Sequence, residues 1–278
     1  MKLLTLNTHS LIEENYKEKL NCFVDAVLKE QPEIIALQEV NQTVNSKKAN
    51  KNLLNHYIQA DDKTIIKEDN HVMRIANMLA HENVTYEWSW TPIKLGYDIY
   101  EEGIAIMSKY PIIEVKEFYI SKNKDFYNWK SRKVLGIKVL VNESFKWFYS
   151  VHMGWWNDEQ DNFMNQWECL TSKLKKDNNL DIYLMGDFNN PDYLSNEGYD
   201  CVINSDWFDT YTLSKNKDDG ITVSNNIDGW ENEKKLNSMR IDYIFKNSNS
   251  EVEASQVIFN GKNYAVVSDH FGVMVTQK

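Results

Sequence analysis

Cysteine is scarce in this chain of 278 residues: only Cys22, Cys169 and Cys201 occur, at spacings that match no metal-binding motif. An odd, sparse set of cysteines argues against a disulfide framework and fits a reducing compartment. Long hydrophobic runs are also missing, because no segment reaches the length of a membrane span and the N-terminus enters a predicted strand without the apolar region of a signal peptide. We therefore expect a cytoplasmic protein that does not enter a membrane.

Positive charge is in short supply as well. The chain has 31 Lys and Arg against 41 Asp and Glu, and its formal net charge is −10. Proteins that hold nucleic acid without sequence preference take most of their affinity from neutralised phosphates, which requires a basic surface. The acidic balance therefore argues against nucleic acid as a partner, although a local basic patch would escape this sum.

Apolar residues make up 42% of the chain, which is enough for a folded globular protein with a sizeable core. Neither a repeat nor a linker interrupts the sequence, so we expect one domain over residues 1–278. Helical spacing of apolar residues predicts helices at 14–30, 69–82 and 160–175. Short apolar or alternating runs predict strands at 3–6, 34–37, 86–90, 103–107, 112–119, 134–141, 145–151, 181–185, 241–245, 252–259 and 272–275.

Strands and helices interleave in two halves of the chain, which predicts an α/β fold with two packed sheets and helices outside them. The polar stretch 214–238 is rich in Asn, Asp, Lys and Ser. We expect it to form a surface loop near the functional site.

Acidic and polar residues recur where predicted strands end. The motifs are Leu37-Gln38-Glu39, Gly186-Asp187-Phe188-Asn189, Arg240-Ile241-Asp242-Tyr243 and Ser268-Asp269-His270, with Asn7 and His152 ending two further strands. Carboxylate and amide oxygens suit a hard divalent cation such as Mg²⁺, and imidazoles suit work on a phosphate ester. The combined set predicts a metal-dependent phosphoester hydrolase.

Each motif alone occurs by chance, but in this order and at these intervals they resemble the endonuclease/exonuclease/phosphatase superfamily, which has the DNase I-like fold. The resemblance extends from Leu3 to Val275, essentially the whole chain. It implies a four-layer α/β sandwich, in which two mainly antiparallel sheets are flanked by helices. It also implies a divalent cation, Mg²⁺ or Mn²⁺, with Glu39 as its principal ligand, Asn7 beside Glu39, and Asp269 near the metal.

The resemblance assigns roles around the phosphate too. Asp187 positions or deprotonates the attacking water, and Asn189 contacts the phosphoryl oxygens. Residues two apart on a strand point to the same side, which agrees with a joint role, although Asp-Phe-Asn-Asn-Pro could also be a turn that caps the strand. His270 contacts the phosphate and Asp242 orients its imidazole. Asp242 could instead pair with Arg240, but neighbours on a strand face opposite ways.

Three further residues complete the predicted site. A strand-end histidine is usually structural, but the family has two histidines beside the phosphate, which implies that His152 is the first of them. An acidic residue supports that histidine in the family, and Glu102 takes this role here in competition with Glu101. Arg132 lies in the densest basic stretch of the chain and is a candidate for binding the substrate phosphate, with simple surface solvation as the alternative.

Tryptophan is abundant, and Trp155 and Trp156 directly follow the block His152-Met153-Gly154. Core packing explains most tryptophans, but neighbours on a strand cannot both point inward. We expect one of the pair to form a platform for a sugar ring. The block and the opening Met1–Ser10 resemble the cytoplasmic sugar-phosphate phosphatases of Gram-positive bacteria within the family. The expected substrate is therefore a small sugar phosphate such as maltose 6'-phosphate.

Other substrates stay open, because a fold does not choose among them. A sphingomyelinase-like phosphodiesterase is the first alternative, and an exodeoxyribonuclease-like nuclease is the second. An inactive member that serves as a binding module is disfavoured by the presence of a full set of acidic and imidazole groups.

Overall fold

Two mixed β-sheets pack face to face and carry helices on their outer sides. The computed structural model describes residues 1–177, 179–224, 227, 230 and 238–278. The first sheet has the strand order β10-β12-β13-β1-β2-β4-β3 and the second β5-β6-β7-β8-β11-β9. In the first sheet the strands are β1 (Lys2–Asn7), β2 (Ile34–Thr43), β3 (Glu87–Gly96), β4 (Tyr100–Ser108), β10 (Ser214–Lys217), β12 (Val252–Ile258) and β13 (Gly272–Gln277). In the second they are β5 (Ile112–Tyr119), β6 (Lys133–Val141), β7 (Ser144–His152), β8 (Asp181–Asp187), β9 (Phe208–Asp209) and β11 (Asp242–Lys246).

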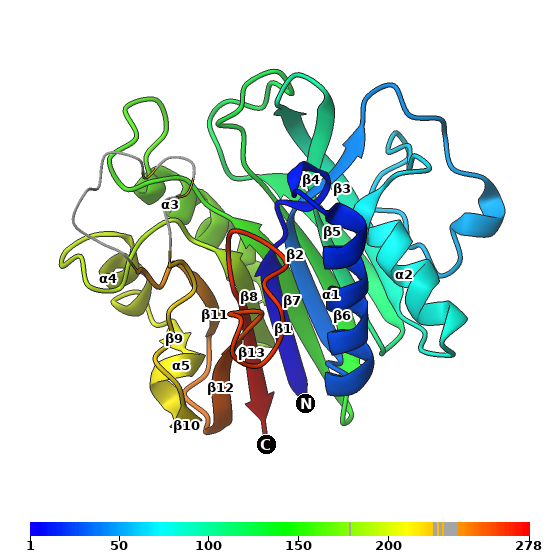
Figure 1. Cartoon of the computed structure of the whole chain (residues 1–278). Helices are drawn as coiled ribbons and strands as arrows, with labels where there is room; N and C mark the ends of the chain where they lie inside the picture. The colour runs from blue at the N-terminus through cyan, green and yellow to red at the C-terminus, as the bar shows by residue number, and fades with distance from the viewer. Residues whose placement is uncertain (178, 225–226, 228–229, 231–237) are drawn as a thin grey trace.

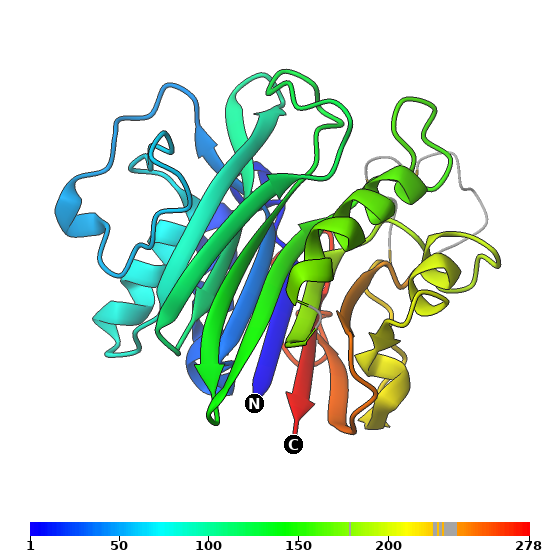
Figure 2. The ribbon, with the colours of Figure 1, turned by 180° about the vertical axis from the view of Figure 1, so that it is seen from behind.

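Helices cover the outer face of each sheet, so that the layers run helix, sheet, sheet, helix. The α-helices are α1 (Tyr16–Glu30), α2 (His71–His81), α3 (Phe163–Leu174), α4 (Gly198–Ile203) and α5 (Thr210–Leu213). Three short 3₁₀ helices are η1 (Ser10–Ile12), η2 (Lys51–Leu53) and η3 (Lys175–Asp177). Figure 1 shows α1 and α2 in front of the first sheet, and Figure 2 shows α3 on the second.

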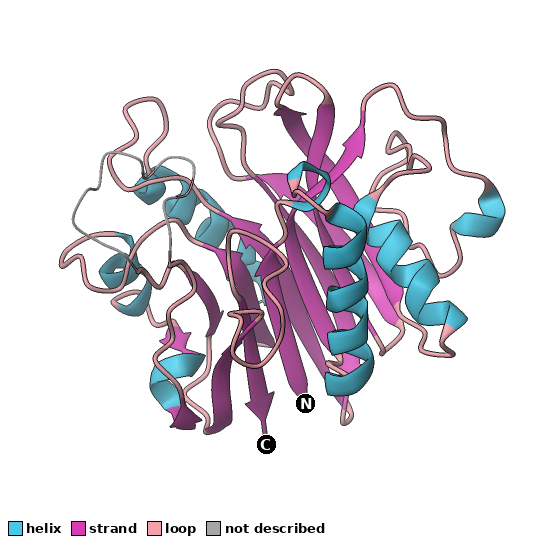
Figure 3. Cartoon of the chain, in the orientation of Figure 1, coloured by secondary structure: helices cyan, strands magenta, loops and turns pink. Residues whose placement is uncertain are grey.

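The alternation of side chains along β1 illustrates how the layers are joined. Leu3 belongs to the apolar cluster between the two sheets, whereas its neighbour Leu4 belongs to the cluster beneath α1 and α2. Helix α1 adds Phe23 and Val27 to that outer cluster, as its helical spacing predicts. Because β1 is buried on both faces, its sequence is mostly apolar. This arrangement confirms the predicted four-layer α/β sandwich (Figure 3).

The predicted elements lie where the sequence places them, but two of them differ in extent or character, and the short elements α4, α5 and β9 were not predicted. Strand β2 continues past its predicted end at Leu37, because a bulge between Leu37 and Val40 lets the chain pair with β4 as far as Thr43. The expected loop 214–238 begins with β10, which pairs in parallel with β12. Residues 225–226, 228–229 and 231–237 of that stretch lie outside the described residues.

Buried hydrogen bonds join the two sheets below their polar ends. The Gln38 amide on β2 donates to Ser150 Oγ on β7 at 2.9 Å, and Ser150 Oγ donates to the carbonyl of Leu37 at 3.0 Å. Both side chains are fully buried. Buried polar groups of this kind are stable only when they are paired, so the two bonds favour one register of β2 against β7.

Gly186 makes the approach of β7 to β8 possible. Its φ is +151°, and a Cβ atom built there would lie 1.9 Å from the carbonyl oxygen of Val151. Any side chain would therefore push β8 away from β7 and displace Asp187, the next residue. The glycine of this motif is therefore required for the close approach of the two strands and not for a chemical step.

None of the helices in the described part of the chain combines the length and the apolar character that crossing a bilayer requires.

Histidine 71 in α2 gives a prediction about acid stability. Its ring is 5% exposed, it contacts Tyr16 Oη at 2.9 Å, and burial lowers its pKa from 6.5 to about 3. The unfolded chain therefore takes up a proton near pH 6.5, well before the folded chain does. The folded state should lose roughly 2 kcal/mol through this group between about pH 7 and pH 5.

Urea unfolding of wild type and His71→Gln at both pH values measures this contribution. The variant should be less stable at neutral pH because it packs less well, but its stability should fall less on acidification. Equal pH dependence in the two proteins would contradict the prediction.

Candidate active site

A cavity of about 480 Å³ opens where strands of both sheets end. Its size suits a small organic ligand. The walls combine carboxylates, imidazoles, two buried cations and aromatic rings. The lining residues are His9, Glu39, Lys94, Leu95, Gly96, Tyr97, Glu102, Trp129, Arg132, His152, Trp155, Asp187, Asn189, Ile227, Asp269 and His270.

The register of the second sheet brings three predicted residues side by side. Asp187 ends β8, and it lies opposite His152 of β7 in the parallel pair and opposite Asp242 of β11 in the antiparallel pair. All three side chains are at least nine-tenths buried. Strand pairing alone thus assembles an Asp–Asp–His group from residues far apart in the sequence.

His270 is held between two carboxylates. Its Nδ1 donates to Asp242 Oδ2 at 2.9 Å, and its Nε2 lies 3.8 Å from Asp187 Oδ2. Burial pulls the pKa of His270 down, but the charges of Asp242 and Asp187 outweigh burial and hold this pKa well above its usual value. Burial and the charge of Asp242 raise the pKa of Asp187 to about 7. The structure thus brings Asp242 to His270, as the sequence predicts, whereas Arg240 pairs with Asp192 and Asp209.

His152 differs from His270 in its charge. Burial, followed by the charges of Arg132 and Lys94, lowers its pKa well below the usual value, so this imidazole is neutral. Its Nε2 lies 3.6 Å from Asp187 Oδ2 and 3.2 Å from the Asn189 amide nitrogen. The cavity therefore contains one charged and one neutral imidazole around the same carboxylate, which provides both a donor and an acceptor for protons.

Asn189 is held in the left-handed region, with φ at +50°. Its backbone N–H donates to Asp187 Oδ1 at 2.8 Å, and its side-chain amide donates to the carbonyl of Met153 at 3.0 Å. The indole of Trp230 donates to its Oδ1 at 3.3 Å. A residue other than glycine that keeps such a backbone, with its N–H and both side-chain polar atoms engaged, is positioned rather than incidental.

Glu39, Asn7 and Asp269 lie on the side of the cavity formed by the first sheet. Glu39 sits in the bulge of β2 with φ at +52°, which turns its side chain toward the cavity. The Asn7 amide donates to Glu39 Oε1 at 2.9 Å and to Asp187 Oδ2 at 3.1 Å. One asparagine thus connects the two halves of the cavity.

The chemistry of these groups fits a hard divalent cation. Burial, followed by the charges of Glu102 and Asp269, raises the pKa of Glu39, because negative charge is concentrated there. A cation would relieve this repulsion, and oxygen ligands of this kind are those that Mg²⁺ and Mn²⁺ take. Glu39, Asn7 and Asp269 could therefore hold such an ion. A second group whose ligand atoms lie close together, Asp187, Asp242 and His270, could also bind a metal, although there the two carboxylates already flank a charged imidazole.

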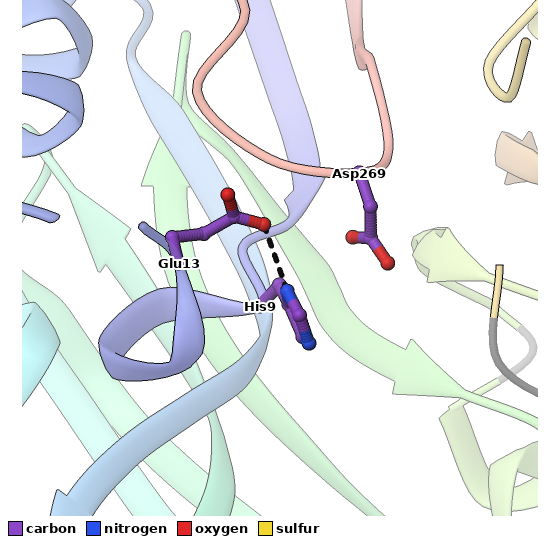
Figure 4. A group of neighbouring side chains, drawn as sticks. All are labelled: His9, Glu13 and Asp269. Carbon is purple, nitrogen blue, oxygen red and sulfur yellow. Dashed lines mark hydrogen bonds and ion pairs between the residues drawn. The ribbon is translucent and has the colours of Figure 1, made fainter. Parts of the chain in front are cut away.

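His9 is a cavity residue that sequence reasoning missed. It follows Asn7-Thr8 at the end of β1, and both His9 and Ser10 have left-handed backbones, with φ at +47° and +41°. Figure 4 shows Nδ1 of His9 facing Glu13 at 2.7 Å, while the other ring nitrogen points away from both Glu13 and Asp269. Burial opposes protonation, but the hydrogen bond to Glu13 together with the charges of Asp269 and Glu39 outweighs burial and raises the pKa of His9 to about 9.

The negative charge of the cluster in Figure 4 is already neutralised by neighbouring cations. His9, Glu13 and Asp269 have ligand atoms close enough for a metal. However, Glu13 also pairs with Lys19, so both of its oxygens face a cation. The cluster therefore positions an imidazolium beside Asp269. Only its place just after the first strand could have drawn attention to His9 in the sequence.

Glu102 lines the cavity, but its partner differs from the expected one. Glu102 Oε1 pairs with Lys94 Nζ at 3.0 Å, while Glu101 pairs with Lys67 outside the cavity. Among the described residues, the polar side chains that contact His152 are Asp187 and Asn189. The structure thus places neither glutamate as the support of His152, because the β3–β4 hairpin brings Lys94 opposite Glu102.

Arg132 is a buried cation rather than a surface one, since it is 2% exposed. Its Nη1 donates to the carbonyls of Trp129 and Ser131, and its guanidinium carbon lies 5.7 Å from the centre of the Trp155 ring. No carboxylate of a described residue lies within ion-pair distance of it. Burial lowers its pKa, although neighbouring carboxylates oppose this.

The tryptophan pair divides between cavity and core. Trp155 lines the cavity, whereas Trp156 packs on Phe163 of α3, with ring centres 6.3 Å apart. The structure therefore brings Trp155 but not Trp156 to the cavity, although both lie in the loop after β7 rather than on a strand. Sequence reasoning missed Trp129, which also lines the cavity and contacts Trp155.

A comparison with protein-family models finds the endonuclease/exonuclease/phosphatase family over residues 4–270. The chain belongs to this family. The endonuclease/exonuclease/phosphatase family consists of hydrolases of phosphoester bonds, so this finding confirms the resemblance noted in the sequence and the coarse activity that it implies. No curated protein sequence matches the chain significantly.

Several solved structures share the fold of this chain. A family protein from Leptotrichia buccalis is 33% identical, with a TM-score of 0.86, and the match covers 100% of this chain and 99% of that one. A mannosyl-6-phosphatase from Bacteroides thetaiotaomicron is 17% identical, with a TM-score of 0.68 and coverage of 99% and 98%. TDP2 from D. rerio, complexed with a single-strand DNA product, is 13% identical, with a TM-score of 0.62 and coverage of 99% and 97%. The last two likenesses show the fold alone.

Proposed function

We propose that the chain is a divalent-metal-dependent phosphomonoesterase that releases phosphate from a small sugar phosphate. The observation that carries the proposal is Arg132, a buried guanidinium in the cavity wall that has no ion-pair partner among the described residues. Burying a charge without a partner is unfavourable, so this position calls for an anion in the cavity. A phosphate group is an anion that a guanidinium binds well.

In this proposal Glu39, Asn7 and Asp269 hold Mg²⁺ or Mn²⁺. When bound, such an ion neutralises charge on the phosphoryl group and polarises its oxygens. Placing the ion among Glu39, Asn7 and Asp269 leaves the imidazoles of His152 and His270 free. The remaining steps belong to the side chains themselves.

Asp187 accepts a proton from the water that attacks phosphorus. Its raised pKa suits this task, because a base works best when its pKa lies near the working pH. As the new P–O bond forms, the bond from phosphorus to the sugar oxygen breaks. His270, kept charged by Asp242, donates a proton to that leaving oxygen. Asn189, His152 and Arg132 contact the phosphoryl oxygens and hold them in place.

The choice of a sugar phosphate rests on the walls around this centre. Trp155 stacks beside Arg132, and an aromatic face suits the apolar face of a sugar ring. The net charge of −10 disfavours a long polyanion. A mannosyl-6-phosphatase of the same fold supports this choice, while TDP2 with its DNA product represents the nuclease alternative.

Phosphate release from a panel of substrates tests the proposal. With Mg²⁺ present, we expect the highest kcat/KM on maltose 6'-phosphate or glucose 6-phosphate. Single-stranded DNA and a choline phosphodiester should be turned over poorly or not at all. A nucleic acid or a choline diester as the best substrate would replace this proposal with the nuclease or sphingomyelinase alternative.

A further inference from the structure

Three side chains form a row from the floor of the cavity to its mouth. Arg132 is 2% exposed, Trp155 is half-buried, and Trp129 is 55% exposed. The guanidinium carbon of Arg132 lies 5.7 Å from the centre of the Trp155 ring, and the Trp155 and Trp129 ring centres lie 5.8 Å apart. Exposure thus rises stepwise along a row of touching groups that begins at the proposed phosphate position.

Trp129 is held in place although its ring is exposed. The guanidinium of Arg132 donates to its backbone carbonyl at 3.1 Å, and Lys130 Nζ lies 5.2 Å from the centre of its ring. Lys130 in turn pairs with Asp158 at 2.6 Å, which ties this loop to the loop that carries Trp155. The two indoles are inclined by 59°, so they make two adjoining faces rather than one flat stack.

An exposed indole in a cavity wall leaves apolar surface in contact with water, which is unfavourable unless a ligand covers it. The neighbouring Tyr127 is 78% exposed as well, but it does not line the cavity. The difference singles out Trp129 as the aromatic residue of this loop that a bound ligand would meet. Large rigid rings bind other rings with little loss of side-chain freedom.

We propose that Trp129 forms a second sugar subsite and makes the enzyme prefer phosphorylated disaccharides over monosaccharides. The inference rests on the proposed function and extends it. With the phosphate at Arg132, the ring that carries the phosphate lies against Trp155. A second ring, joined through a glycosidic bond, then reaches Trp129 at the mouth. A monosaccharide phosphate ends before Trp129 and gains nothing from it.

Steady-state kinetics of phosphate release with three substrates test this order of subsites. Glycerol 1-phosphate has no ring, glucose 6-phosphate has one, and maltose 6'-phosphate has two. In Trp129→Ala, KM should rise roughly tenfold for maltose 6'-phosphate only, with kcat little changed, because the ring binds ground and transition states alike. In Trp155→Ala, KM should rise for both sugars. Trp129→Ala should not affect glycerol 1-phosphate, because that substrate ends before Trp129.

Tyr127→Ala is the matched control, because it removes an exposed ring from the same loop outside the cavity. It should leave all three KM values unchanged, and equal Tm values should show that all variants fold. Equal effects of Trp129→Ala on glucose 6-phosphate and maltose 6'-phosphate would overturn the subsite, as would no effect on either. An effect confined to a dinucleotide, tested as a fourth substrate, would overturn the sugar assignment.

Phosphate release by the wild-type protein distinguishes a failure of the Trp129 subsite from a failure of the proposed function. If wild type hydrolyses both sugar phosphates but Trp129→Ala behaves like wild type, the subsite is wrong and the proposed function stands. If wild type releases no phosphate from either sugar, the proposed function itself fails.

Discussion

Replacing Asp187 with Asn is expected to lower kcat by roughly 10²–10⁴-fold, the range for positioned acid–base groups. The amide keeps the size of the side chain but cannot accept the proton from water. His270→Ala should cause a loss of similar size, because it removes the charged imidazole between Asp187 and Asp242. Phosphate release at saturating substrate measures both effects. Circular dichroism and Tm should show folded proteins, since both residues lie where a strand or loop meets the cavity.

Coupling between Asp242 and His270 gives a sharper test of the same arrangement. Asp242 contacts Nδ1 of His270 and should act mainly through it, although its charge also helps to raise the pKa of Asp187. The double variant Asp242→Asn/His270→Ala should therefore be little worse than His270→Ala. If the two losses simply add in free energy, Asp242 has a role of its own and this account of the pair is wrong.

Removing the metal is expected to abolish activity altogether. Incubation with a chelator should reduce phosphate release to background, and Mg²⁺ or Mn²⁺ should restore it. Glu39→Gln should weaken metal binding and lower activity strongly, because it removes the carboxylate charge from the predicted principal ligand. Calorimetric titration with Mn²⁺ measures the binding independently of turnover.

Glu101→Gln is the matched control for Glu39→Gln. Glu101 is an acidic neighbour of the site that pairs with Lys67 and Gln42 and does not line the cavity. The Glu101→Gln variant should bind Mn²⁺ with the same affinity as the wild type. Full activity in chelator, or equal Mn²⁺ affinity of Glu39→Gln and wild type, would refute the proposed metal position.

Much of the fold could be predicted from the sequence, because periodicity is a local property. The apolar faces of α1 and α2 and the short buried strands follow directly from the order of residues. The extension of β2 beyond Leu37 could not be predicted, because it depends on a bulge and on pairing with β4. Short elements such as α4 and β10 were missed for a similar reason: each is stabilised by contacts with distant segments rather than by its own pattern.

The candidate site shows the same division. The strand-end residues Asp187, Asp242 and His152 meet because neighbouring strands end together, so their motifs indicate a shared place. The partner of Glu102 could not be inferred, because Lys94 arrives from another strand across a hairpin. Trp129 was overlooked in the sequence because it looks like any exposed residue in a basic loop, and only the fold places it beside Trp155.

The hydrogen bonds of Gln38 and Ser150 lie at the boundary between two halves of the cavity that belong to different sheets. Glu39 and Asn7 come from one sheet, and His152 and Asp187 from the other, so neither sheet alone contains a complete reaction centre. The rate of phosphate release should therefore depend on the packing of the two sheets against each other, and activity should disappear in denaturant as the sheets separate. The loop that carries Trp129 is not part of this contact between the sheets. Substrate range can therefore diverge among relatives while the chemistry stays the same.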